Sequence, residues 1–425
     1  MEEQNLKNGL DEPLCALPFV HPFFDVRGFY FPCCNAAEYI EGRTKHVSEM
    51  TAEQWFYSDE MDQLRSDMLN GVRSDLCTHC WKKDDLKIHS PRLSANDHWR
   101  NKYDVFNPKP MFFDLKPSNH CNLACIFCTA SSSDKIMKIT DSLSENEKPS
   151  RWASSVKNLR EREETLGDSF DPTVIDYIKN NIKDLELLKF TGGEPFLSKK
   201  VLEILTLVSE IKPEVEIKIT TNGTVITKDF YPILRKMKKT SIKFSIDAVE
   251  DLYTYIRFPS KWTQFNTRIE NNMAMLPDVK FNVNCLITNM NLEQLPKIRN
   301  WFKELQSKYT NLEYIIIDPN LTPNENESSL YVVPPKLLQN VKQFLIQETA
   351  DWDLSDKTDS QIKIVFKKID DAIKNTLWNG NDILLYREFW LQNSIRKMNI
   401  ANAVEPITKD FFLQDLKINE NRNIW

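Results

Sequence analysis

The chain has 425 residues, 41% hydrophobic and 27% charged, which predicts a globular protein with room for roughly two or three domains. A net charge of −6 disfavours nucleic acid as a partner, and no apolar run is long enough to cross a bilayer. The amino-terminal residues are polar and acidic, so we expect no signal peptide. Nine cysteines then indicate metal or redox chemistry in the cytoplasm rather than disulfides.

The first fifth of the chain holds five of the cysteines, Cys15, Cys33, Cys34, Cys77 and Cys80. Aromatic and polar residues alternate around residues 25–28 and predict a hairpin, which would bring Cys15 close to Cys33. A helix is expected over residues 51–70, followed by the CxxC pair of Cys77 and Cys80. Four thiolates delivered in this way can close a site for zinc or for an iron–sulfur cluster.

Between residues 111 and 319, short apolar runs alternate with amphipathic helical patterns, which is typical of repeated βα units around a parallel sheet. One expected helix is 199–211, with Val201, Leu202, Leu205 and Val208 on one face. Active-site residues in such folds gather at the carboxyl ends of the strands. We expect strands over residues 111–115, 185–190, 215–220, 242–246, 280–287 and 312–317.

A CxxxCxxC run of Cys121, Cys125 and Cys128 follows the first of these strands and is the most informative feature of the chain. Three thiolates this close can hold three irons of a four-iron cluster and leave the fourth iron open for chemistry, although clustered thiolates also suit zinc. The sequence TGGEP, residues 191–195, follows the second strand. Its glycines would let the backbone approach a ligand closely, and its carboxylate would suit an ammonium group.

The cysteine spacing, the aromatic Phe127 before the last cysteine and the TGGEP turn resemble the radical S-adenosylmethionine (SAM) superfamily. The resemblance implies an α/β fold with a partial (β/α)6 TIM-like barrel, and a [4Fe–4S] cluster on Cys121, Cys125 and Cys128 whose open iron binds SAM. It also implies SAM contacts at five positions, of which two end the third and fourth strands: Phe127, Gly193, Glu194, Thr220 and Ser245.

Four further residues are expected near the same pocket, although a turn, a helix cap or a surface pair explains each equally well: Asn222, Asp247, Arg257 and Asn284. Cys285 lies alone in an apolar run, and we expect it to be a buried hydrophobic side chain.

The amino-terminal cysteines resemble the twitch domain, a shorter relative of the SPASM domain of radical SAM enzymes. The resemblance implies that Cys15, Cys33, Cys77 and Cys80 hold an auxiliary [4Fe–4S] cluster, with Cys34 as a spare neighbour. In most such enzymes the module follows the barrel, whereas here it precedes the barrel. Zinc stays the alternative occupant of these four cysteines.

These patterns divide the chain into an auxiliary iron–sulfur domain over 1–100, a radical SAM core over 108–319 and a helical extension over 320–425. The core carries an insertion over 130–184, which begins as a polar loop and ends in a helix over 171–182. It would serve as a lid or as a surface loop. The extension begins with a polar linker and predicts helices over 335–346, 360–377 and 383–400, which we interpret as a cap or a partner surface.

The function implied by these resemblances is that of an oxidoreductase. It would cleave SAM reductively to a 5′-deoxyadenosyl radical, take a hydrogen atom from a substrate and oxidise it by two electrons in all, with the auxiliary cluster accepting an electron. The insertion and the extension favour a peptide or protein substrate over a sugar alcohol or a nucleotide-like small molecule. An electron donor such as flavodoxin or ferredoxin is implied, and no catalytic acid or base is assigned. The alternative of another class is a non-catalytic scaffold with zinc in both cysteine groups.

Overall fold

The computed structural model describes residues 13–25, 28–36, 45–85, 89–160, 172–319, 329–378, 383–398, 400–410 and 413. These residues form two compact units. The first contains the described residues up to 119 together with 160–219 and 236–239, and the second contains 120–159, 220–235 and the described residues from 240 onward. The three predicted domains were defined by their sequence motifs, whereas these units are defined by contacts, and the domain boundaries stay predictions.

The strands of the first unit follow the order β2-β1-β3-β4-β5. β1 (Phe23–Phe24) and β2 (Tyr30–Phe31) form the predicted antiparallel hairpin, and β1 then pairs in parallel with β3 (Phe112–Leu115). β4 (Leu187–Phe190) and β5 (Glu216–Thr221) continue in parallel. The hairpin, which lies between Cys15 and Cys33 in the sequence, is therefore an extension of the sheet that contains β3.

The helices of this unit are α1 (Leu17–Val20), α2 (Ala52–Phe56), α3 (Asp59–Leu69), α4 (Thr78–Asp85), α5 (Pro91–Trp99), α8 (Pro172–Asn180) and α9 (Lys199–Ile211). The single helix predicted over 51–70 is wrong, because α2 and α3 are separate. Ser58 has an extended backbone and its hydroxyl accepts from the amide of Met61, so it caps a new helix. The capping box of Thr51 and Gln54 is present as predicted.

Apolar side chains between the sheet and its helices form the core of this unit. Phe113 of β3 meets Tyr177 of α8 edge to face, with ring centroids 5.5 Å apart. On α9 the buried face consists of Val201, Ile204, Leu205 and Val208, whereas the predicted Leu202 is only half-buried. The helical period was correct, and the stripe lies slightly to one side of the predicted face.

The second unit contains three parallel strands, β6 (Lys239–Ser245), β7 (Lys280–Ile287) and β8 (Leu312–Pro319). Helices α10 (Phe230–Lys236), α11 (Glu250–Ile256), α12 (Trp262–Met275) and α13 (Leu295–Lys308) alternate with them along the chain. All six strands predicted between residues 111 and 319 are thus confirmed, in the alternating order of an α/β fold. Cys285 is fully buried, as predicted.

The first part of the insertion is helical, so the predicted polar loop is wrong. It forms α6 (Asp134–Ser142) and α7 (Ser150–Arg160). The apolar residues are sparse but correctly spaced, because Trp152, Val156 and Leu159 fall on one buried face of α7. The helix predicted over 171–182 is confirmed as α8, and residues 161–171 lie outside the described residues.

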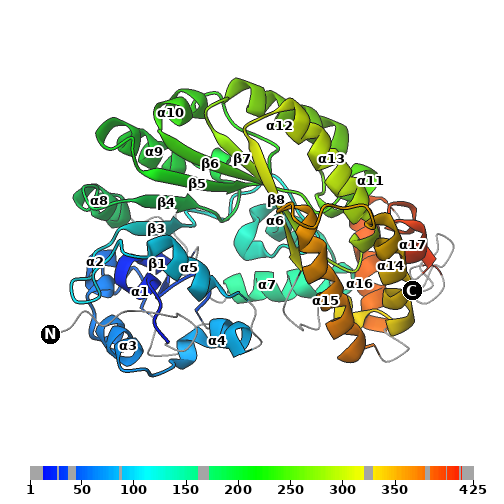
Figure 1. Cartoon of the computed structure of the whole chain (residues 1–425), viewed down its shortest axis with the longest axis horizontal. Coiled ribbons are helices and arrows are strands. Elements are labelled where there is room, and N and C mark those ends of the chain that lie inside the picture. Colours follow the sequence, from blue (N-terminus) through cyan, green and yellow to red (C-terminus); the bar gives the residue numbers. More distant parts are fainter. Residues whose placement is uncertain are drawn as a thin grey trace. The chain divides into compact units, whose positions relative to one another are not determined.

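The carboxy-terminal extension contains the three predicted helices, α14 (Pro335–Glu348), α15 (Ile362–Lys374) and α16 (Ile383–Arg396), followed by α17 (Pro406–Asp410). They gather in one place, in orange to red (Figure 1). The polar linker predicted before them lies almost wholly outside the described residues. No helix in the described part of the chain has the length and apolar character needed to cross a membrane.

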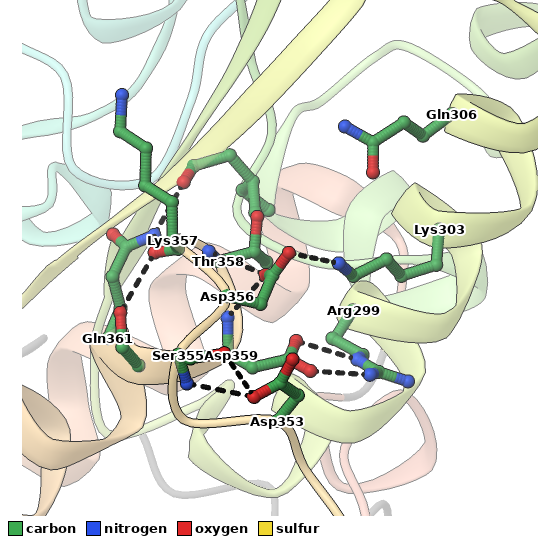
Figure 2. A network of polar contacts seen from close by, with 12 residues as sticks. Arg299, Lys303, Gln306, Asp353, Ser355, Asp356, Lys357, Thr358, Asp359 and Gln361 are labelled. Carbon is green, nitrogen blue, oxygen red and sulfur yellow. Dashed lines mark hydrogen bonds and ion pairs between the residues drawn. The ribbon is translucent and has the colours of Figure 1, made fainter.

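A polar network joins this extension to the strands and helices of the second unit (Figure 2). Arg299 of α13 forms a bidentate pair with the buried Asp359, with N–O distances of 2.9 and 2.6 Å. Lys303 pairs with Asp356 at 3.0 Å. The Gln361 side chain donates to the carbonyl of Ile315 and accepts from the amide of Ile317, which occupies the edge of β8. The extension is therefore built onto the strands rather than attached by a linker alone.

Candidate metal centres

The loop over residues 121–128 brings the three thiols of the CxxxCxxC run together in the second unit. Cys125 is buried, while Cys121 and Cys128 are half-buried, and the amide of Cys128 donates to the carbonyl of Cys125 at 3.1 Å. The Cys128 thiol donates to the sulfur of Cys125, which lowers the pKa of Cys125 and raises that of Cys128. The negative charge of Cys121 also raises the pKa of Cys128, so the Cys128 sulfur interacts with both of the other cysteines.

Backbone hydrogen bonds fix the middle of this loop against the end of α11. The amide of Ala124 donates to the carbonyl of Phe258 at 2.7 Å, and the amide of Ile126 donates to the carbonyl of Ile256 at 3.1 Å. These contacts satisfy the polar groups of a buried, irregular segment and hold its cysteines in place.

Arginines of the insertion and of the extension hold the same loop from other sides. Arg151 of α7 donates to the carbonyl of Phe127 at 2.7 Å, and Arg396 of α16 donates to the carbonyl of Ala124 at 3.0 Å. The carboxylate of Glu388 on α16 accepts from the amide of Ser150 at 3.0 and 2.9 Å and from its hydroxyl. The insertion and the carboxy-terminal extension, in which the sequence patterns assigned no catalytic or ligand residue, thus support the cysteine loop.

Arg257 and Asp247 form a buried pair directly beside Cys125. Arg257 Nη2 lies 2.5 Å from Asp247 Oδ2, and Nη1 donates to the Cys125 sulfur at 3.8 Å. Asp247 Oδ1 accepts from the amide of Leu286 at 2.9 Å. Burial raises the pKa of Asp247, although the charge of Arg257 acts in the opposite direction. Burial by itself would lower the pKa of Arg257, but the negative charges of Asp247 and Cys125 raise this pKa above its ordinary value.

Asn222 supports Cys121 in a similar way. Its amide nitrogen lies 3.7 Å from the Cys121 sulfur and 2.9 Å from Asn122 Oδ1, while its oxygen accepts from Thr224. The turn requires Gly223, whose φ is +72° and whose added Cβ would lie 2.7 Å from a ring carbon of Phe265. Two of the residues expected near the pocket, Asn222 and Arg257, therefore contact cysteine sulfurs.

The residues predicted to contact SAM are divided between the two units. Phe127, Thr220 and Ser245 are half-buried in the second unit, and Ser245 pairs in register with Asn284 across β6 and β7. Gly193 and Glu194 belong to the first unit.

The glycine turn is tightly constrained by the backbone that follows β3. Gly192 has a φ of +107°, and an added Cβ would lie 3.0 Å from the carbonyl oxygen of Ser118. The same carbonyl accepts from the amide of Gly193 at 3.0 Å. Glu194 is almost fully buried, and its carboxylate accepts from the amide of Phe196 at 3.1 Å. Glycine is therefore required by the close approach of two backbone segments.

The four amino-terminal cysteines also lie together, within the first unit. Burial raises the pKa of Cys15 and of Cys77 to about 12, and the charge of Cys80 contributes to both shifts. Burial raises the pKa of Cys33 strongly, and Cys15 and Cys77 add to that shift. Buried thiols of this kind become thiolates when a metal centre supplies positive charge, so the donors suit a cluster. Among the described histidine, cysteine, aspartate and glutamate side chains, no group of three is arranged to hold a single metal ion.

Arg92 of α5 supports this group and was missed by the sequence patterns. Its Nε lies 2.8 Å from Asp84 Oδ2 with both side chains almost fully buried, and its Nη1 donates to the carbonyl of Leu14 at 2.9 Å. Asn96 accepts from the amide of Ala16 at 2.8 Å, so α5 holds the backbone on both sides of Cys15. A single arginine in a polar segment carries no sequence signal of this role.

Cys34 is exposed, and its charge raises the pKa of the adjacent Cys33. The nearby carboxylate of Asp114, to which the Cys34 thiol donates, raises the pKa of that thiol. Asp114 faces Lys189 across β3 and β4, with an N–O distance of 2.6 Å.

The comparisons with known proteins match the central part of the chain. Residues 115–302 fit the family model of the radical SAM superfamily. The probable GTP 3′,8-cyclase of Methanocaldococcus jannaschii is 26% identical over 37% of this chain and 56% of its own length. The GTP 3′,8-cyclase of Mannheimia succiniciproducens is 30% identical over 28% of this chain and 35% of its own length.

Solved structures of low similarity also match. SuiB of Streptococcus suis, bound to S-adenosylmethionine, is 15% identical with a TM-score of 0.35, over 57% of this chain and 45% of that one. The chain spans about a third to just over half the length of the first curated relatives that it matches. Residues 115–302, the part of the chain that matches the radical SAM superfamily model, include both the cysteine loop and the glycine turn.

Proposed function

We propose that Cys121, Cys125 and Cys128 hold a [4Fe–4S] cluster with one open iron, and that the enzyme takes a hydrogen atom from a substrate that is oxidised overall. When bound, the cluster and SAM supply the electron and the 5′-deoxyadenosyl radical for this reaction. The single observation that carries the proposal is the convergence of three thiols in one supported loop, with Arg257 donating to Cys125. The run supplies three soft sulfur donors, which suit a four-iron cluster with one open iron.

The protein would supply SAM binding and orientation. The backbone of Gly193 and the carboxylate of Glu194 would face the methionine ammonium, Thr220 and Ser245 the carboxylate and ribose, and the Phe127 backbone the adenine. The six alternating strands favour a partial (β/α)6 barrel around this site, since such folds gather their functional groups at the carboxyl ends of strands. Exclusion of water and a fixed orientation of one C–H bond would set the selectivity.

We also propose an auxiliary [4Fe–4S] cluster on Cys15, Cys33, Cys77 and Cys80, in a module similar to the twitch domain. A cluster with four cysteine ligands has no open iron, so it would accept an electron from the substrate rather than bind it. The charges of these thiols shift one another's pKa values, which supports the grouping. Zinc is the alternative occupant of the four cysteines, and metal analysis of the purified protein distinguishes it from iron. The partners would be a cytoplasmic electron donor such as flavodoxin or ferredoxin.

The substrate class has two candidates. The preference for a peptide or protein was based on the insertion and the extension, and the contacts of Arg151 and Arg396 give both segments a supporting role. The peptide substrate stays a prediction. The names of the curated relatives, GTP 3′,8-cyclases, favour the second candidate, a nucleotide-like small molecule. Incubation with purine nucleotides and with co-expressed peptides, read by mass spectrometry for a loss of two hydrogens or for a rearranged nucleotide, separates the two.

Anaerobic purification with iron, sulfide and zinc analysis tests the proposal. We expect about eight irons per chain, four for each cluster, and 5′-deoxyadenosine when SAM and dithionite are added. Cys125→Ala should abolish SAM cleavage, whereas Cys77→Ala should spare it and block substrate turnover. Cys285→Ala is the matched control, because this buried cysteine belongs to neither group. Zinc without sulfide would establish the scaffold instead.

A further inference from the structure

We propose that Arg257 and Asn222 raise the reduction potential of the cluster held by Cys121, Cys125 and Cys128, and that Asp247 limits the effect of Arg257. The inference rests on the proposed function, because it requires the cluster to be bound. It assigns to three residues of this chain the role of setting the reduction potential of the cluster, and it assigns them no contact with the substrate.

The contact of Arg257 with Cys125 is direct and buried. Nη1 lies 3.8 Å from the sulfur, and the guanidinium is held by Asp247 at 2.5 Å. The side chain of Arg257 is 11% exposed and that of Asp247 is 1% exposed. Because little water screens the pair, the charge acts on the sulfur in a medium of low dielectric constant. An arginine also keeps its charge at any pH relevant to the enzyme.

The contact of Asn222 with Cys121 is neutral but directional. Its amide nitrogen lies 3.7 Å from the sulfur. The side-chain oxygen accepts from both the amide and the hydroxyl of Thr224, at 2.9 and 2.6 Å, and this fixes which end of the amide group faces the cysteine. Two of the three ligand sulfurs thus have a side-chain donor supplied from outside the cysteine loop.

Charge and hydrogen bonding both change the potential of a cluster in a known direction. Reduction adds negative charge to the cluster and its sulfurs, and a nearby cation or an N–H donor stabilises the reduced form more than the oxidised form. Arg257 and Asn222 therefore make the cluster easier to reduce. Asp247 is needed to hold Arg257 in place, and its own negative charge offsets part of the effect.

The two other arginines that contact the cysteine loop do not donate to a cysteine sulfur. Arg151 donates to the carbonyl of Phe127, and Arg396 donates to the carbonyls of Ala124 and Tyr255. Arg396 lies close enough to Cys125 for charge to act between them, but its donors are directed at backbone oxygens. Arg257 is thus distinguished by donating to a ligand sulfur, and the exposed Arg268 of α12 provides a control.

The test is an anaerobic redox titration of the reconstituted full-length enzyme, followed by electron paramagnetic resonance. The signal that changes when SAM is added identifies the open cluster. We expect Arg257→Met to shift the midpoint potential to a more negative value, and Arg257→Lys to shift it less because the charge is retained. Asn222→Ala should give a smaller negative shift, and Asp247→Asn a positive shift. Arg268→Met, a change at an exposed residue of α12, should leave the potential unchanged.

Unshifted potentials in Arg257→Met and Asn222→Ala, with full iron content, would overturn the inference. An equal shift in Arg257→Met and Arg257→Lys would also overturn it, because charge would not be the cause. If Arg257→Met loses the cluster, the other two variants test the inference: a negative shift in Asn222→Ala and a positive shift in Asp247→Asn support it, and the opposite directions overturn it. A wild-type enzyme with no SAM-sensitive signal would contradict the proposed function itself, which separates the two failures.

Discussion

Arg396 Nη2 donates to the carbonyl oxygen of Ala124 at 3.0 Å, which joins the last long helix of the extension to the middle of the cysteine loop. The same side chain donates through Nε to the carbonyl of Tyr255 at 2.8 Å. Trp152, Tyr255 and Phe258 surround its guanidinium with aromatic rings at 5.4 to 5.6 Å. The extension is therefore part of the structure that holds the loop.

Replacing Arg396 by leucine should weaken both the fold and the cluster. The substitution leaves the buried carbonyls of Ala124 and Tyr255 without donors, and hydrogen bonds to a charged group contribute about 1.5–3 kcal/mol each. We expect a lower midpoint of thermal unfolding and a loss of iron from the open cluster after desalting. Lys363→Met is the control, because Lys363 is exposed on α15. Equal iron retention in both variants would show that the extension is not needed by the loop.

The contact between Ser150 and Glu388 should behave as one coupled unit. The carboxylate accepts from the amide and the hydroxyl of Ser150 at the start of α7, as a capping group does. We expect Glu388→Ala to cost about 1–2 kcal/mol of unfolding free energy and to speed hydrogen exchange in the first turn of α7. In a double-mutant cycle with Ser150→Ala, the two costs should add to more than the cost of the double variant. Additive costs would mean that the hydroxyl contact contributes nothing.

Much of this architecture could be predicted from residue patterns, because the strands are short apolar runs of the expected length. All six predicted strands lie where expected, and the CxxxCxxC run brought its three thiols together because its spacing is local. The insertion was harder. Its helices carry few apolar residues, and α7 buries Trp152, Val156 and Leu159 within an otherwise polar segment.

The supporting residues of the metal centres could not be predicted for a different reason. Arg396 lies 272 residues from Ala124, and Glu388 lies 238 residues from Ser150. No local pattern records such contacts, since each depends on how distant elements pack. Arg257 was identified only as a residue near the pocket, because nothing in its neighbours shows which sulfur it contacts.

Arg92 should be needed for the amino-terminal cysteine group and not for the open cluster. Removing one partner of a buried ion pair costs about 3–5 kcal/mol, because the other charge is left buried. Arg92→Met leaves Asp84 unpaired and the carbonyl of Leu14 without its donor beside Cys15. We expect iron to fall from about eight to about four per chain while SAM cleavage is retained. Arg100→Met, an exposed change at the end of α5, should keep all the iron. Loss of the SAM-sensitive signal in Arg92→Met would contradict this separation.

His21 should make the protein sensitive to acid. The imidazole is buried, stacks on Phe112 with ring centroids 4.2 Å apart and bonds through Nδ1 to the carbonyl of Phe112 at 3.1 Å. Burial lowers the pKa of His21 to about 4, although Asp114 opposes the shift. The unfolded chain takes up a proton near pH 6.5, whereas the folded chain takes it up only near pH 4. The unfolding free energy should therefore be highest above pH 6.5 and fall as the pH drops from 6.5 to 4, by an amount on the order of 3 kcal/mol.

Chemical denaturation across this range measures the effect as a difference between variants. His21→Gln cannot take up the proton, and its unfolding free energy should change less than that of the wild type between pH 6.5 and 4. The cysteine groups are the same in both proteins, so their own pH dependence cancels in the comparison. His89→Gln removes an exposed histidine and should keep the wild-type slope. Parallel pH profiles for the wild type and His21→Gln would mean that His21 has the same pKa in the folded and the unfolded chain, against the burial that lowers its pKa in the fold.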